Sequence, residues 1–189
     1  MNDYFNMKLD HNFINWAFRN TLDNSFRGIV AEYLVHNAVG GASIHRVNWD
    51  AYDVEMNDGT KIEVKSSGYV QSWSQKKPSV ILFDISKKDP WKASENQYLG
   101  YKCRYADIWV FAVHAEKDRD KADPFDLSQW QFLVTTSDWL DAEFGDQKTV
   151  RYSMLLNKGL YPVPYSDLLK TIQQVKRESQ SAIISQNKS

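Results

Sequence analysis

Two carboxylates and a lysine, Asp53, Glu63 and Lys65, stand in a short segment at a spacing that suits metal-dependent hydrolysis. If the segment is a hairpin that pairs Asp53 with Glu63, their β-carbons lie about 5 Å apart, and Lys65 is a diagonal neighbour of Asp53. Carboxylates this close repel each other, and Mg²⁺ prefers one or two carboxylates together with waters and phosphate oxygens. A bound Mg²⁺ would polarise a phosphate and lower the pKa of a water, which Lys65 could orient. The other interpretation is a solvated hairpin face with charge pairs.

The turn of this hairpin decides whether the two carboxylates face each other. A three-residue turn at 57–59, with Gly59 left-handed, pairs Val54 with Ile62 and Asp53 with Glu63. A two-residue turn would mix the apolar and charged faces. We therefore predict the three-residue turn.

Glu32 is the only Asp, Glu, Lys or Arg between Arg27 and Arg46. It lies in a helix predicted from residue 25 to about 38, with Ser25 as the N-cap and a Gly-Gly pair at the end. A lone carboxylate in such a helix is either a surface residue or a buried group with a function. Its position before a carboxylate-rich hairpin makes Glu32 a candidate third metal ligand.

The remaining pattern is typical of an α/β domain with a mixed central sheet flanked by helices and a C-terminal strand and helix extension. We predict strands at 43–48, 52–56, 60–66, 80–85, 107–114 and 131–135, and helices at 11–22, 25–38, 94–105, 137–144 and 166–178. A length of 189 residues suits a single domain, 1–178, followed by a flexible tail, 179–189.

Composition narrows the class of protein. The formal net charge is −1, so contacts with nucleic acid must come from local patches. Cys103 is the only cysteine, which excludes an internal disulfide and a cysteine-built zinc site. The N-terminus lacks the apolar core of a signal peptide, and the most apolar stretch, 108–113, is too short to span a bilayer. We therefore expect a cytoplasmic protein with no membrane partner.

These residues resemble the PD-(D/E)XK, or restriction-endonuclease-like, nuclease superfamily. That family has an acidic residue at the end of one strand and E-x-K on the next, here Asp53 and Glu63-Val64-Lys65. It often carries a glutamate on the preceding helix, which Glu32 matches. Its core order of helix, three strands, helix and strand is similar to residues 25–114. Tyr52 stands where a proline often precedes the first acid.

The resemblance implies a Mg²⁺-dependent nuclease for DNA, more specifically an endonuclease, in which Mn²⁺ substitutes for Mg²⁺. Asp53, Glu63, Glu32 and the Val64 carbonyl would hold the metal, and Lys65 would assist the water. A glutamine soon after the motif often lies close to the site in this family, and Gln71 fills that place. Segment 66–77 would contact phosphates and bases through Ser66, Ser67, Gln71, Trp73, Lys76 and Lys77.

Several alternatives stay open. Segment 66–77 is also readable as a polar surface loop with one packed tryptophan. A second basic cluster, comprising Lys87, Lys88, Lys92, Lys102 and Arg104, either extends the nucleic-acid track or is a solvated face. The protein could be a catalytically silent module that binds nucleic acid or protein, or a nuclease for RNA or free ends. Cutting both strands of a duplex would favour a homodimer.

Overall fold

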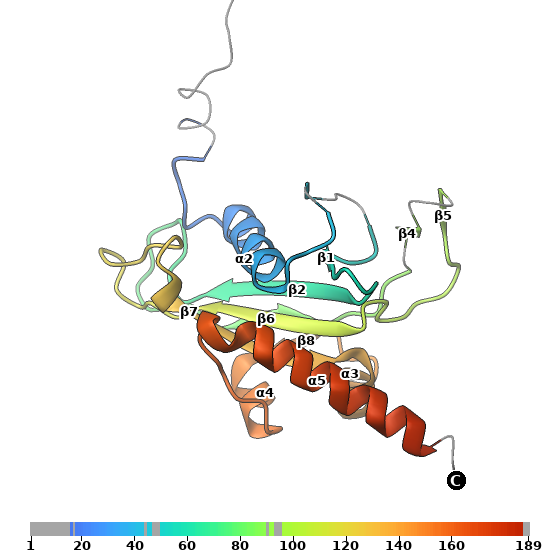
Figure 1. The fold of residues 1–189 in the computed structure, drawn as a ribbon. Helices are drawn as coiled ribbons and strands as arrows, with labels where there is room; N and C mark the ends of the chain where they lie inside the picture. Colours follow the sequence, from blue (N-terminus) through green and yellow to red (C-terminus); the bar gives the residue numbers. More distant parts are fainter. Residues whose placement is uncertain are drawn as a thin grey trace, which may run out of the picture.

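The structure, a computed structural model, describes residues 16, 18–43, 45–46, 50–89, 91–92 and 96–186 (Figure 1). Its main sheet has four strands in the order β1-β2-β6-β7, which are β1 (Val54–Glu55), β2 (Lys61–Gly68), β6 (Ile108–His114) and β7 (Trp130–Thr136). Strands β2 and β6 are parallel, whereas β1 and β7 pair antiparallel with their neighbours. The predicted α/β fold with a mixed sheet flanked by helices is confirmed, and it is compatible with a restriction-endonuclease-like core.

Two apolar clusters form the core, one on each face of this sheet. Strand alternation sends Ile62 and Val64 to the face covered by α2 (Asn24–Val39) and α5 (Tyr165–Gln186). The opposite face carries Trp109 and Phe111. It is covered by a two-stranded sheet and two further helices, namely β3 (Leu82–Asp84), β8 (Thr149–Arg151), α3 (Ser137–Phe144) and α4 (Tyr152–Asn157).

The hairpin register agrees with the sequence prediction. Val54 pairs with Ile62 and Glu55 with Lys61, and Gly59 has φ 83°, the left-handed conformation that the three-residue turn requires. The predicted helix 137–144 coincides with α3. No helix in the described part of the chain is long and apolar enough to cross a bilayer.

Helix α2 begins one residue earlier than predicted, and its cap differs. Asp23 is the N-cap, because its carboxylate accepts hydrogen bonds from the Ser25 and Phe26 amides at 2.8 and 3.4 Å. Ser25 therefore lies inside the helix, and its prediction as the cap was wrong. Gly40 ends the helix with φ 60°, as expected of a left-handed C-cap.

The segment that connects β2 to β6 departs most from the prediction. The described residues of 94–105 form no helix, and instead β4 (Trp91–Lys92) pairs with β5 (Gln97–Tyr98). Asn96 and Gly100 have φ of 51° and 80°, which a helix does not tolerate. Strand β3 lies within the predicted strand 80–85, and it pairs with β8 in a sheet separate from the main one.

Smaller differences occur near both ends of the chain. The described residues of the predicted strand 43–48 are not in a strand, and residues 44, 47 and 48 lie outside the described part. Half of the predicted helix 11–22 also lies outside it; of its described residues, Trp16 is helical and residues 18–22 are not. A short 3-10 helix (Leu127–Gln129) precedes β7. Helix α5 continues to Gln186, past the predicted end at residue 178.

Candidate active site

Strand β2 and the segment entering β1 bring Asp53 and Glu63 together. The Asp53 amide donates at 3.0 Å to the carbonyl of Ile62, the partner of Val54, so Asp53 stays bonded to β2 although the regular pairing ends at Val54. The Asp53 carboxylate in turn accepts a hydrogen bond from the Val64 amide at 2.7 Å. This bond holds the Asp53 side chain against β2, where Glu63 and Lys65 share one face.

The Lys65 ammonium lies between the Glu63 carboxylate and the indole ring of Trp109. Its ammonium forms an ion pair with Glu63, and the two side chains are only 20% and 15% exposed. Strand pairing sets Glu63 beside Trp109 of β6, and the Lys65 Nζ lies 5.7 Å from the centre of that indole ring. The amine is thus fixed at the margin of the apolar core rather than extended into solvent.

Burial and charge shift the pKa values of this group. Burial, reinforced by the negative charge of Glu63, raises the pKa of Asp53 to about 7, although Lys65 and the Val64 amide counteract the rise. Burial by itself would lower the pKa of Lys65, but the Glu63 and Asp53 carboxylates outweigh it, and the pKa is raised. Lys65 is therefore a cation at neutral pH.

All three side chains line one cavity of about 340 Å³. We call it the catalytic cavity, after the role that the sequence predicts for these three residues. Its other walls are partly aromatic, with Trp91, Tyr98, Tyr105 and Trp109, and partly polar, with Asp50, Ser86, Lys88, Asp89, Cys103 and Arg104. Arg104 is not available to a ligand, because its buried guanidinium donates to the Ile85 carbonyl at 2.9 Å and forms an ion pair with Asp141.

The residues of this cavity fit a divalent cation held by two carboxylates. In the described part of the chain, no three His, Cys, Asp or Glu side chains converge as a metal site. Mg²⁺ does not require three, since it commonly takes one or two carboxylates and completes its coordination with waters and phosphate oxygens. The pKa of Asp53 is raised first by burial and then by the negative charge of Glu63 beside it, and a cation would offset that charge.

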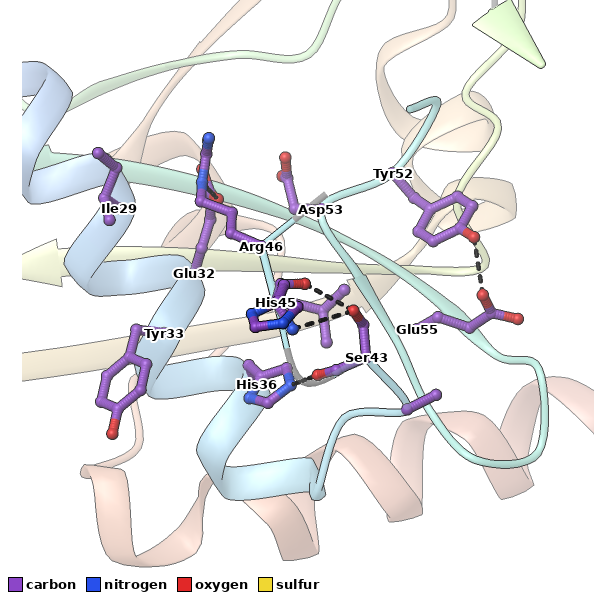
Figure 2. Close-up of a pocket in the computed structure, with 12 residues that line it drawn as sticks. Ile29, Glu32, Tyr33, His36, Ser43, His45, Arg46, Tyr52, Asp53 and Glu55 are labelled. Atoms are coloured by element: carbon purple, nitrogen blue, oxygen red, sulfur yellow. Dashed lines mark hydrogen bonds and ion pairs between the residues drawn. The ribbon is translucent and has the colours of Figure 1, made fainter. Parts of the chain in front are cut away.

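Glu32 lies on the other side of Asp53. Its carboxylate forms a two-pronged ion pair with Arg46, with N–O distances of 2.5 and 2.9 Å. Both residues line a second cavity of about 360 Å³ between α2 and residues 42–55, and Asp53 lines both cavities. Figure 2 shows the Glu32 and Arg46 side chains against each other, near Asp53. The role of Glu32 as a third metal ligand stays a prediction.

Gln71 has structural partners. It is 6% exposed, its amide donates to the Gly68 carbonyl at 2.8 Å, and its oxygen accepts from Arg27 at 3.1 Å. These bonds attach the loop after β2 to helix α2, and Gln71 is not among the residues that line the catalytic cavity.

The other residues predicted to contact nucleic acid lie outside this cavity too. Ser66 points to the α2 face, near Gly28, and Ser67 is 8% exposed. Trp73 is 55% exposed, and Lys76 and Lys77 are exposed. Their contacts with nucleic acid stay a prediction.

Sequence reasoning missed Arg46 and the aromatic wall of the catalytic cavity. The pairing of Arg46 with Glu32 joins positions that are 14 residues apart across a loop, and no spacing rule predicts it. Trp91 and Tyr98 escaped notice because their segment was interpreted partly as a helix. The aromatic residues between 91 and 105 were the available signal, and they fit a hairpin better than a helix.

Comparison with known protein families places most of the chain in one of them. Residues 15–150, which are 136 of the 189 residues, match the family model described as bacteriophage T4 endonuclease IV. The matched region includes α2, the hairpin and every residue that lines the catalytic cavity. No curated protein matches the chain.

Proposed function

The chain belongs to the bacteriophage T4 endonuclease IV family, and from this premise we propose that it is a metal-dependent endonuclease that hydrolyses phosphodiester bonds in DNA. The observation that carries the proposal is the convergence of Asp53, Glu63 and Lys65 in one cavity. The spacing of these residues also supports a nuclease of the PD-(D/E)XK type.

We assign the metal to Asp53 and Glu63, with Glu32 and the Val64 carbonyl as further ligands. Mg²⁺ is the natural choice for carboxylate oxygens, and Mn²⁺ should substitute for it. When bound, the ion would polarise a phosphate oxygen and lower the pKa of a water molecule.

The role of Lys65 follows from its charge. Because its pKa is raised, Lys65 is a proton donor and not a general base at neutral pH. Its ammonium is suited to orienting a water or stabilising the negative charge that develops on the phosphate oxygens. Glu63 fixes the position of the ammonium through their ion pair.

The test is cleavage of supercoiled plasmid, linear duplex, single-stranded DNA and RNA with Mg²⁺ or Mn²⁺, with EDTA as the control. We expect metal-dependent cutting that Glu63→Ala, Asp53→Ala and Lys65→Ala each reduce by at least about a hundredfold, the usual scale for loss of one stabilising group. Glu143→Ala removes a carboxylate of α3 that pairs with Lys158 and does not line the cavity, and this variant should cut like the unmodified protein.

Two other outcomes would redirect the assignment. DNA binding that is independent of metal, with no cutting of any substrate, would identify a binding module. Cutting of RNA or of free ends alone would keep the nuclease chemistry and change the substrate. Double-strand cutting by one site per chain would favour a homodimer, and a monomeric sedimentation profile together with such cutting would contradict that.

A further inference from the structure

Strands β4 and β5 form an aromatic arm beside the catalytic cavity. Figure 1 shows this pair of strands standing apart from the main sheet. Trp91 and Tyr98 are direct partners across the arm, so their side chains share one face. Their rings meet edge to face with centroids 5.0 Å apart, and both residues line the cavity that holds Glu63 and Lys65.

The exposure of this pair needs an explanation beyond packing. Tyr98 is 63% exposed, although a tyrosine ring carries a large apolar surface. The edge-to-face contact stabilises the arm but leaves most of the Tyr98 surface in water. An aromatic side chain kept at the mouth of a charged cavity is suited to a ligand that is itself partly aromatic and partly anionic.

The base of the arm is attached to the body of the protein. Lys88 and Cys103 exchange backbone hydrogen bonds of 3.1 and 2.9 Å, and the Asp89 carboxylate accepts from the Gly100 amide at 2.9 Å. The Arg104 guanidinium donates to the Ile85 carbonyl at 2.9 Å. These contacts set the position of the aromatic pair relative to β2, as a binding surface requires.

We propose that Trp91 and Tyr98 form a stacking site for a nucleobase of the substrate, next to the phosphate on which Asp53, Glu63 and Lys65 act. The inference rests on the proposed function and adds the residues that bind the base. Every nucleobase presents a flat aromatic face on which a side chain can stack. The site should therefore bind any of the bases with little preference among them.

The experiment measures KM and kcat on an oligonucleotide in which the position of the cut has been mapped. The test variants are Tyr98→Leu, which keeps an apolar side chain against Trp91, and Tyr98→Phe, which keeps the ring. Tyr101→Leu is the matched control, because Tyr101 is 60% exposed, lies three residues beyond β5 and does not line the cavity. Circular dichroism and melting curves verify that each variant is folded.

We expect Tyr98→Leu to raise KM by about 5- to 150-fold, the range for one base stacked on an aromatic ring. Tyr98→Phe and Tyr101→Leu should change KM less than about threefold, which lies below the weakest stack in that range. Abasic nucleotides are then placed in turn on each side of the mapped cut. One position should raise KM for the unmodified protein by a similar factor and have no added effect on Tyr98→Leu.

The outcomes separate this inference from the proposed function. No metal-dependent cutting by the unmodified protein would defeat both. Normal cutting in which Tyr98→Leu behaves like Tyr101→Leu would overturn the stacking site alone. Additive effects of Tyr98→Leu and the abasic nucleotide would do the same, because they would show that Tyr98 and the base act independently.

Discussion

At the scale of single residues, the site is defined by an imbalance of charge. Asp53 and Glu63 place two carboxylates beside one ammonium, that of Lys65, in a mostly buried position. Burial, together with the negative charge of Glu63, raises the pKa of Asp53 to about 7, and part of the imbalance is relieved when Asp53 takes up a proton. A divalent cation would relieve it in another way, and it would compete with that proton.

Metal affinity should therefore depend on pH. The folded-state pKa of Asp53 is raised, so the neutral acid predominates below about pH 7 and must lose its proton to bind a metal. We expect Mn²⁺ affinity, measured by calorimetry, to weaken about tenfold per pH unit below 7 and to level off above it. Asp53→Asn should bind Mn²⁺ weakly, and its affinity should depend little on pH. A flat profile for the unmodified protein from about pH 5.5 to 7 would contradict the prediction.

Glu32 and Arg46 provide a second test at this scale. An ion pair with one exposed partner is worth about 0–1 kcal/mol, so Arg46→Gln should release Glu32 and tighten Mn²⁺ binding by at most about fivefold. Glu32→Gln should weaken Mn²⁺ binding by about tenfold or more if the carboxylate is a ligand. Unchanged Mn²⁺ affinity in Glu32→Gln would show that Glu32 is only the ion-pair partner of Arg46 and not a metal ligand.

At the scale of secondary-structure elements, the position of Asp53 depends on the turn of the hairpin that β1 and β2 form. Gly59 has φ 83°, and a side chain there would have to adopt the left-handed conformation. The turn sets the register, and the register brings Asp53 to Glu63.

Gly59→Ala should lower the free energy of unfolding by about 1–2 kcal/mol. Gly28→Ala is the matched control: a β-carbon there comes no closer than 3.9 Å to Ser66, inside helix α2. That change should raise the free energy of unfolding by about 0.5–1 kcal/mol. Urea denaturation measures both, and a Gly59→Ala variant at least as stable as the unmodified protein would show that the turn is not under this constraint.

At the scale of the whole molecule, the last helix belongs to the core although it lies beyond the family match. Helix α5 begins after residue 150, where the match ends. Its Leu168 and Ile172 side chains are nevertheless fully buried in the apolar cluster that α2 and α5 form with one face of the main sheet. The aromatic ring of Tyr165 packs near Phe132 of β7, with centroids 6.2 Å apart. The sheet that carries the site is thus covered on one face partly by α5.

Ile172→Ala should accordingly destabilise the protein by about 2–5 kcal/mol, the usual cost of an isoleucine-sized cavity in a core. Gln173→Ala, at an exposed position on the same helix, should change stability by less than about 0.5 kcal/mol. Equal stability of the two variants in urea would indicate that α5 is not part of the folded domain.

The sequence by itself determined the features that depend on near neighbours. Alternation and turn chemistry predicted the pairing of Val54 with Ile62, and they predicted that Asp53 and Glu63 lie close together, as they do in one cavity. The start and end of α3 were also readable, because its cap and its apolar residues lie within one short segment. These predictions succeed because the interactions that decide them span only a few residues.

Only the tertiary structure decided the rest of the site. The Glu32–Arg46 pair, the separate sheet of β3 and β8, and the aromatic arm of β4 and β5 depend on which distant segments pack together. Local propensity cannot select among such pairings, because each is stabilised by burial and hydrogen bonding that exist only after the chain has folded. For that reason the sequence located the acidic residues and the lysine, while the walls of their cavity became visible only in the fold.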